Sequence, residues 1–338
     1  MVYNDYRQRK GDKMMRACCK DLGKSQEGSK KTESRNKLFK KLKKKSWNLY
    51  ILLLPALVYV AIFCYAPLYG LQIAFKDYVS YLGIGASPWV GMKHFINFVT
   101  ATNFWPLIKN TLTLSLYSLA LGFPLPIILA LIINEVSNKT YKRVVQTISY
   151  APYFISTVVV VGMVFTLFSV DHGVINSIIK AFGGDPVYFM SSADLFPTLY
   201  VFSGLWQGMG WSSIIYVGAL SSVDQSLHEA ATIDGASRMQ RIVHINLPAI
   251  RSVVLVSLLL SIGGLMSVGF EKAWLMQTAG NITSSEIIST FVYKVTIAAQ
   301  IPQYSFGTAV DLFNAVINIT LLVIANLLAK RFGQESLW

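Results

Sequence analysis

The residues most suited to specific charged contacts lie in a polar segment, residues 221–250, that separates two long apolar runs. Glu229 follows Ser226 by three positions, a spacing that predicts a capping box at the start of a helix. Gly235 stands where a left-handed residue commonly ends a helix. The segment therefore predicts a short helix, about residues 227–234, that carries the carboxylate of Glu229.

Small residues in this helix would let another surface approach it closely. Ala230 and Ala231 give one part of the helix almost no side-chain bulk. Ser237 can cap a second helical stretch, and Pro248 suits the first turn of the helix that follows. We therefore expect a helix, a turn and a second helical stretch within one polar loop.

Residue types that perform catalysis or bind metals are few and scattered. The three cysteines imply no disulfide framework, and the four histidines show no metal-ligand spacing. Gly23-Lys24-Ser25 resembles the end of a phosphate-binding loop, but Cys18 occupies the place of its first glycine and no strand precedes it. We therefore expect no metal, no bound cofactor and no site for ATP hydrolysis, so the chain is not predicted to be an enzyme.

The elements that position the polar loop are predicted to be membrane helices. Of 338 residues, 53% are hydrophobic and only 14% are charged, whereas soluble domains carry about a quarter charged residues. This composition excludes a disordered chain, a disulfide scaffold and a large soluble enzyme. Six charge-free stretches are long enough to cross a bilayer and predict an all-α polytopic membrane protein with spans at about 48–75, 110–134, 146–170, 195–223, 250–270 and 309–329.

The net charge of +13 sets the orientation of these spans. Residues 1–47 carry +11 of it, so we expect a basic, disordered N-terminal tail in the cytoplasm. Alternating sides then place the loop 221–250, the C-terminal tail 333–338 and both termini in the cytoplasm. No recognition-helix or zinc pattern accompanies the charge, so we do not expect nucleic-acid binding.

The middle of each predicted span contains no Asp, Glu, Lys or Arg. Ion-driven carriers commonly place an ionisable group near the membrane midplane as a coupling site. A self-contained secondary carrier is therefore disfavoured, although backbone carbonyls can also bind sodium. If the protein pumps, we expect its energy to come from another subunit.

The polar loop also carries a resemblance to a known family. Glu229-Ala230-Ala231, Gly235, Ile245 and Leu247-Pro248 match the signature EAA-x3-G-x9-I-x-LP of permease subunits of binding-protein-dependent ABC sugar importers, the maltose-type family. Residues 89–95 look like the segment that leads to that family's second helix. Residues 269–273 and 288–294 look like the LplB-like permeases, which import oligosaccharide fragments of polysaccharides. The resemblance covers residues 47–332.

The resemblance implies a six-helix, type I importer permease domain over residues 48–332, in the plasma or inner membrane. It implies a second homologous permease, two cytoplasmic ATPases that hold ATP and Mg, and an extracellular sugar-binding lipoprotein. The residues that would couple to the ATPase are Glu229, Ala230, Ala231, Asp234, Gly235, Ile245, Leu247 and Pro248. An ABC permease for another small solute remains an alternative.

Aromatic and polar residues within the spans are the candidates for a sugar pathway. Gly204 and Gly208 suit tight helix packing, and packing or an interfacial belt also explains the aromatic residues beside them. Glu271 could contact sugar or form a solvated pair with Lys272. Asn314 and Asn318, four positions apart in the last predicted span, are expected to present two amides on one helix face. The candidate pathway residues are Trp206, Gln207, Trp211, Tyr216, Glu271, Asn314 and Asn318.

Overall fold

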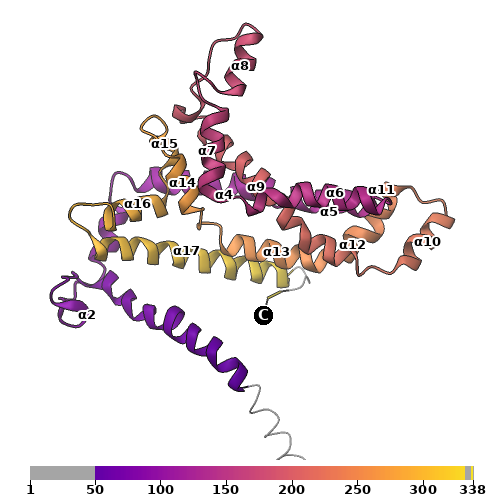
Figure 1. Cartoon of the computed structure of the whole chain (residues 1–338). Helices are drawn as coiled ribbons and strands as arrows, with labels where there is room; N and C mark the ends of the chain where they lie inside the picture. Colours follow the sequence, from indigo (N-terminus) through magenta and orange to yellow (C-terminus); the bar gives the residue numbers. More distant parts are fainter. Residues whose placement is uncertain (1–49, 332–335, 338) are drawn as a thin grey trace, which may run out of the picture. The chain divides into compact units, whose positions relative to one another are not determined.

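The computed structural model describes residues 50–331 and 336–337 (Figure 1). The predicted basic tail, residues 1–47, and most of the predicted C-terminal tail, residues 333–338, lie outside the described residues. Within the described part the structure is helical and contains no strand, only an isolated bridge between Lys76 and Trp89. The predicted all-α fold class is confirmed.

The chain divides into two units, Met1–Gly70 and Leu71–Trp338. A helix begins at Tyr50 and runs to Phe75, with a π-helical turn at Ala61–Tyr65 and a 3-10 stretch at Ala66–Phe75. Its mean hydropathy of 2.3 and its 26 residues are enough for a membrane span.

The second unit consists of α-helices joined by short 3-10 and π-helical turns (Figure 1). Its α-helices are α2 (Gly83–Ala86), α3 (Lys93–Val99), α4 (Phe104–Gly122), α5 (Pro124–Glu135), α6 (Lys139–Tyr150), α7 (Thr157–Leu167), α8 (Val174–Ala181), α9 (Phe196–Leu220), α10 (Gln225–Ile233), α11 (Arg238–Arg241), α12 (Leu247–Ala249), α13 (Arg251–Gly263), α14 (Phe270–Met276), α15 (Ile282–Ser285), α16 (Ile288–Thr296) and α17 (Tyr304–Arg331). The turns are η3 (Ala151–Phe154), η4 (Phe189–Ser191) and η5 (Ile242–Asn246).

Three helices of the described residues are long and apolar enough to cross a membrane: Tyr50–Phe75, Phe104–Glu135 and Tyr304–Arg331. Two further candidates are bent pairs, α6–η3 with α7 at 99° and α11–α12 with α13 at 63°. The number of six spans stays a prediction, because α9 is interrupted by polar residues and is not among the three.

The bend between α6 and α7 occurs where the backbone loses helical hydrogen bonds. Pro152 has no N–H, and Ser156 adopts an extended conformation and caps α7 by accepting from the Val159 N–H. The predicted span 146–170 is therefore two helical segments rather than one straight helix.

The predicted span 250–270 is also interrupted, because α13 ends at Gly263 and α14 begins only at Phe270. Side chains of α17 bind the backbone of this break. Asn318 Oδ1 accepts from the Met266 N–H at 2.9 Å, and Asn314 Nδ2 donates to Met266 O at 3.4 Å. Polar side chains of a neighbouring helix thus satisfy backbone groups that the broken helix leaves free.

Helix α9 is the central element of the second unit and packs against α4, α5, α6, α7, α13 and α14. Its closest helix approach is at Gly210, where an added Cβ would lie 1.9 Å from Ser149 O of α6. Tight packing was expected at Gly204 and Gly208 instead. Gly208 makes no close approach, because a Cβ there would meet nothing within 4 Å, whereas a Cβ at Gly204 would lie 2.9 Å from Lys272 Nζ of α14.

Buried apolar side chains form three clusters in this unit. One joins α4, α7, α9 and α14 around Phe196, and one joins α3, α4, α16 and α17 around Phe98. The third joins α5, α9 and Ile250 near the polar loop. Each cluster involves α4, α5 or α9, so these helices form the scaffold on which both the loop and the cavities described below are built.

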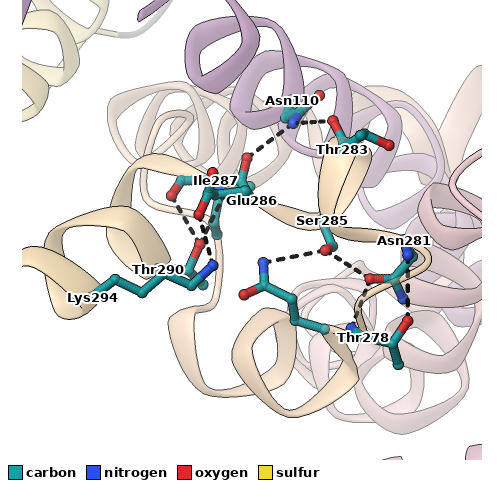
Figure 2. A network of polar contacts seen from close by, with 10 residues as sticks. Asn110, Thr278, Asn281, Thr283, Ser285, Glu286, Ile287, Thr290 and Lys294 are labelled. Carbon is teal, nitrogen blue, oxygen red and sulfur yellow. Dashed lines mark hydrogen bonds and ion pairs between the residues drawn. The ribbon is translucent and has the colours of Figure 1, made fainter. Parts of the chain in front are cut away.

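A polar network anchors α14, α15 and α16 to α4 (Figure 2). Asn110 Nδ2 of α4 donates to Thr283 O and Glu286 O, at 2.9 and 3.0 Å. The Glu286 carboxylate in turn accepts from Lys294 Nζ at 2.7 Å. These contacts hold α15 against α4 and join its end to α16.

Asn281 is the most connected side chain of this network (Figure 2). It is fully buried; its Nδ2 donates to Met190 O and Met276 O, and its Oδ1 accepts from Thr278 N–H and Ser285 Oγ. We expect Asn281→Ala to lower the free energy of unfolding by about 3 kcal/mol, because it leaves several buried polar groups without partners. Faster amide hydrogen exchange over residues 276–290 would show the loss. Asn97→Ala, an exposed asparagine of α3, is the control, and equal exchange in both variants would contradict this role.

Candidate coupling loop and substrate groove

Helix α10 begins two residues earlier than the sequence analysis expected. Asp224, not Ser226, is the N-cap, and its Oδ1 accepts from the Ser226 N–H at 2.9 Å. That hydrogen bond holds the pKa of Asp224 below its ordinary value. The predicted capping box of Ser226 and Glu229 is wrong, and the Glu229 carboxylate is free of capping contacts in the described structure.

The end of α10 agrees with the prediction for Gly235, which has a φ of +79°. The Gly235 N–H donates to Thr232 O at 3.1 Å and the Ala236 N–H to Ala231 O at 2.9 Å, the paired bonds of a Schellman motif. Asp234 is the C-cap and is exposed, and the described turn is held by backbone bonds rather than by its carboxylate.

The surface of α10 is acidic and apolar at once. Glu229 and Ala230 are exposed, and the side chains of Leu227 and Ile233 are 54% and 87% exposed. Large apolar side chains exposed beside a carboxylate are typical of a surface that a protein partner covers. In Figure 1, α10 lies beyond the ends of α11 and α12, where such a partner could reach it.

The second half of the loop follows the predicted helical stretch. Ser237 caps α11 in a capping box with Gln240. Ile245 is partly buried, but Leu247 and Pro248 are exposed. The fully buried contacts are made instead by Asn246 and Ile250, the neighbours of the predicted packing residues.

An ionic contact that the sequence analysis missed connects this loop to the end of α5. Arg241 donates to Thr232 Oγ1 of α10, and its guanidinium lies 3.9 Å from the Glu135 carboxylate. Asn246 Nδ2 donates to the same carboxylate at 3.2 Å. We call Glu135, Thr232, Arg241 and Asn246 the loop latch. It joins α10 to α5, which belongs to the 32-residue apolar helix Phe104–Glu135.

A groove of two adjoining cavities, of about 520 and 250 Å³, lies among α4, α5, α9 and α13. Five residues line both cavities and so join them, namely Ser118, Gly122, Pro126, Tyr200 and Ser212. Glycines and serines alternate in the wall with large apolar side chains such as Phe123, Ile215 and Leu265, and the serines present hydroxyl groups to the space. We call this space the serine groove.

Only Tyr216 of the candidate pathway residues lines the serine groove, and it is buried. Trp206 lines a separate apolar cavity of about 510 Å³ between α7 and α9. Trp211 stacks on Tyr153 with ring centroids 4.5 Å apart, and Gln207 Nε2 donates to Ile155 O at 2.9 Å. Trp211 and Gln207 thus support the bend between α6 and α7.

The remaining candidates lie elsewhere. Asn314 and Asn318 share one face of α17, as the sequence analysis expected, but there they hold the break after α13. Glu271 is exposed. The suggested solvated pair of Glu271 with Lys272 is wrong, because Lys272 is only 8% exposed and faces α9.

The described residues contain no group of three or more His, Cys, Asp or Glu side chains that could hold a metal ion. The arrangement contains instead a helix-and-turn loop suited to a protein partner and a hydroxyl-lined groove among membrane helices. Together these features define a membrane transport subunit.

Residues 122–335 match the family model described as binding-protein-dependent transport system inner membrane component, so the chain belongs to this family. Two proteins of Bacillus subtilis (strain 168) are similar over most of their length. The polygalacturonan/rhamnogalacturonan transport system permease protein YteP is 44% identical over 91% of this chain and 95% of its own. Protein LplB is 45% identical over 88% of this chain and 92% of its own.

A solved structure of similar fold is that of a bacterial alginate ABC transporter in complex with an alginate pentasaccharide-bound periplasmic protein. Its matching chain is 39% identical, with a TM-score of 0.78, and the match covers 87% of this chain and 98% of that one. The predicted ABC importer permease fold, the membrane location and the resemblance to the LplB-like permeases are confirmed. The family is a transport component, which also confirms that the chain is not an enzyme.

Proposed function

We propose that this chain forms half of the pathway by which an ATP-driven importer carries oligosaccharides, the breakdown fragments of polysaccharides, through the cell membrane. The observation that carries the proposal is the geometry of α10, a capped helix with an exposed Glu229 that ends at the left-handed Gly235. The named substrates of the relatives, polygalacturonan, rhamnogalacturonan and alginate, support a sugar cargo.

The proposed assembly contains a second, homologous permease, two cytoplasmic ABC ATPases and an extracellular sugar-binding lipoprotein. The family's dependence on a binding protein supports the last of these partners. ATP and Mg belong to the ATPase subunits, and this chain binds neither. The coupling residues are the seven of the loop signature together with Asp234, with Glu229 facing a basic residue of the ATPase and Ala230 allowing the helix to dock closely.

In this account the ATPase moves α10, and the loop latch passes the movement to the membrane helices. Arg241 donates a hydrogen bond to Thr232 of α10 and forms an ion pair with the carboxylate at the end of α5. Helix α5 contributes Pro126 to the serine groove and packs along α9, which lines the groove's other side. A displacement of α10 therefore reaches the walls of the groove through a short series of direct contacts.

Glu229→Ala tests the proposed docking of α10. We expect the variant to bind the ATPase about tenfold or more weakly, because a hydrogen bond to a charged group contributes roughly 1.5–3 kcal/mol. Glu229→Gln should weaken binding similarly if the negative charge is what the ATPase recognises. The measurement is the amount of ATPase that co-purifies with the permease pair at several ATPase concentrations.

Asp185→Ala is the matched control, since Asp185 is also an exposed acidic residue but lies between α8 and η4. It should leave ATPase binding unchanged. Equal co-purification by wild type, Glu229→Ala and Glu229→Gln would contradict the coupling role of this carboxylate.

A further inference from the structure

Lys272, the third residue of α14, is a buried cation beside the serine groove. Its Nζ donates to Tyr200 O at 2.7 Å and lies 4.8 Å from the centroid of the Tyr200 ring. A lysine ammonium has three N–H donors, and the described residues accept from only one of them. Lysine is rarely buried to this degree without a charged partner.

The described residues provide no carboxylate for this ammonium within 4.0 Å. The adjacent Glu271 is exposed and forms no ion pair there. Burial without a counter-ion lowers the pKa of Lys272 to about 7, so an anion bound at Nζ would stabilise its charged form. Ionisable groups within membrane helix bundles mark pathways for charged substrates. The missing anion is therefore expected to come from a ligand.

The surroundings of Lys272 are open on the groove side. Lys272 lines the smaller cavity together with Gly204, Ser118 and Ser212. A Cβ at Gly204 would lie 2.9 Å from Lys272 Nζ, so the absence of a side chain there makes room for the ammonium. The hydroxyls of Ser118 and Ser212 line both cavities and bond to no described residue, so they can bond to sugar hydroxyls.

We propose that Lys272 is a substrate-binding residue that recognises the carboxylate of an acidic oligosaccharide in the serine groove, while Ser118 and Ser212 bind its hydroxyls. The proposal rests on the proposed function of the chain as a sugar permease and names the class of sugar. An ammonium acts as a compact point charge without a fixed fork geometry, which suits a carboxylate that must bind and then move on. A neutral sugar would leave the buried ammonium without an anion, so the groove binds neutral sugars less well than acidic ones.

The test compares ATP-driven uptake of a uronic acid trisaccharide with uptake of the same trisaccharide after reduction of its carboxyl groups. Both are measured with the complete importer and its binding protein in proteoliposomes, and the result is the ratio of acidic to neutral uptake. The same binding protein is used throughout, so its own preference between the two sugars changes every measured ratio by the same factor. We expect Lys272→Gln to lower the ratio about tenfold or more, because a charge-assisted contact is lost. Lys272→Arg, which keeps the charge, should retain most of the ratio.

Lys180→Gln is the matched control, because Lys180 Nζ also donates to a backbone carbonyl, Val170 O, but its side chain is exposed. It should leave the ratio unchanged. If Lys272→Gln does not assemble with its partners, Gly204→Ala decides the question, since it keeps the lysine but displaces its ammonium and should also lower the ratio.

An unchanged ratio in an assembled Lys272→Gln importer would overturn the proposal, as would equal uptake of both sugars by the wild type. If the wild type took up neither sugar in an ATP-dependent way, the proposed function itself would fail. The two failures are therefore distinguishable.

Discussion

The Gly235→Pro variant is expected to lose ATP-driven uptake by a factor of about 100 or more, because proline in an incompatible conformation costs about 3 kcal/mol or more. Gly235 has a φ of +79°, whereas the proline ring fixes φ near −65°. Proline would also remove the N–H that donates to Thr232 O at 3.1 Å. The turn after α10 could then no longer form, and α10 would no longer be held in its docking position. Uptake of a labelled oligosaccharide and co-purification of the ATPase measure the two consequences.

Gly235→Asn is the matched variant for this glycine. Asparagine adopts the left-handed conformation at a cost of about 1 kcal/mol, so uptake should fall by less than about tenfold. If the proline and asparagine variants transport equally well, the left-handed turn has no part in coupling.

The Arg241→Ala variant is expected to reduce uptake about 30-fold while leaving the importer assembled, because it removes contacts to a charged group worth roughly 2 kcal/mol. The side chains of Arg241 and Glu135 are only 19% and 18% exposed, so solvent screens their interaction less than it screens a surface pair. Loss of the loop latch should uncouple ATP hydrolysis from transport. The ratio of ATP hydrolysed to sugar imported should therefore rise in this variant.

Lys142→Ala controls for the loss of a positive charge, since Lys142 lines the same polar cavity as Arg241 but forms no ion pair in the described structure. The Lys142→Ala variant should hydrolyse as much ATP for each sugar imported as the wild type does. A double-mutant cycle of Arg241→Ala with Glu135→Gln should show a coupling energy of about 1 kcal/mol. Strictly additive effects would contradict a direct interaction between these two residues.

Local features of the coupling loop could be predicted from sequence because they depend on neighbouring residues. The left-handed Gly235 and the cap at Ser237 follow from backbone chemistry over a few positions, and both were found. The start of α10 was misplaced because Asp224 and Ser226 can both act as an N-cap. The carboxylate of Asp224, two residues before Ser226, accepts from the Ser226 N–H, so the helix begins after Asp224.

Features that depend on contacts between distant helices could not be predicted in the same way. The loop latch joins Glu135 to Arg241, and no local spacing relates them. A solvated pair of Lys272 with Glu271 was one of the two alternatives for Glu271, because the two residues are adjacent in sequence. Consecutive residues of a helix point about 100° apart, so one can be buried against α9 while the other is exposed.

The candidate pathway residues show the same difference between local features, which the sequence predicts, and contacts between distant helices, which it does not. Sequence correctly placed Asn314 and Asn318 on one face of α17, but only the tertiary structure shows that this face meets the break after α13. Trp211 was a candidate because aromatic faces bind sugars, yet its ring stacks on Tyr153 across the bend between α6 and α7. The glycines and serines of the groove come from α4, α9, α13 and the break after α13, and such small residues carry little signal in a sequence.

The most direct test of the central claim is the energy source of transport. Labelled oligosaccharide uptake should be measured in proteoliposomes that contain this chain with its partner permease, the ATPases and the binding protein, and in proteoliposomes that contain this chain alone. The account predicts accumulation that requires ATP and the binding protein, and none by the chain alone. Accumulation by the chain alone, driven by an ion gradient and unaffected by ATP, would contradict it.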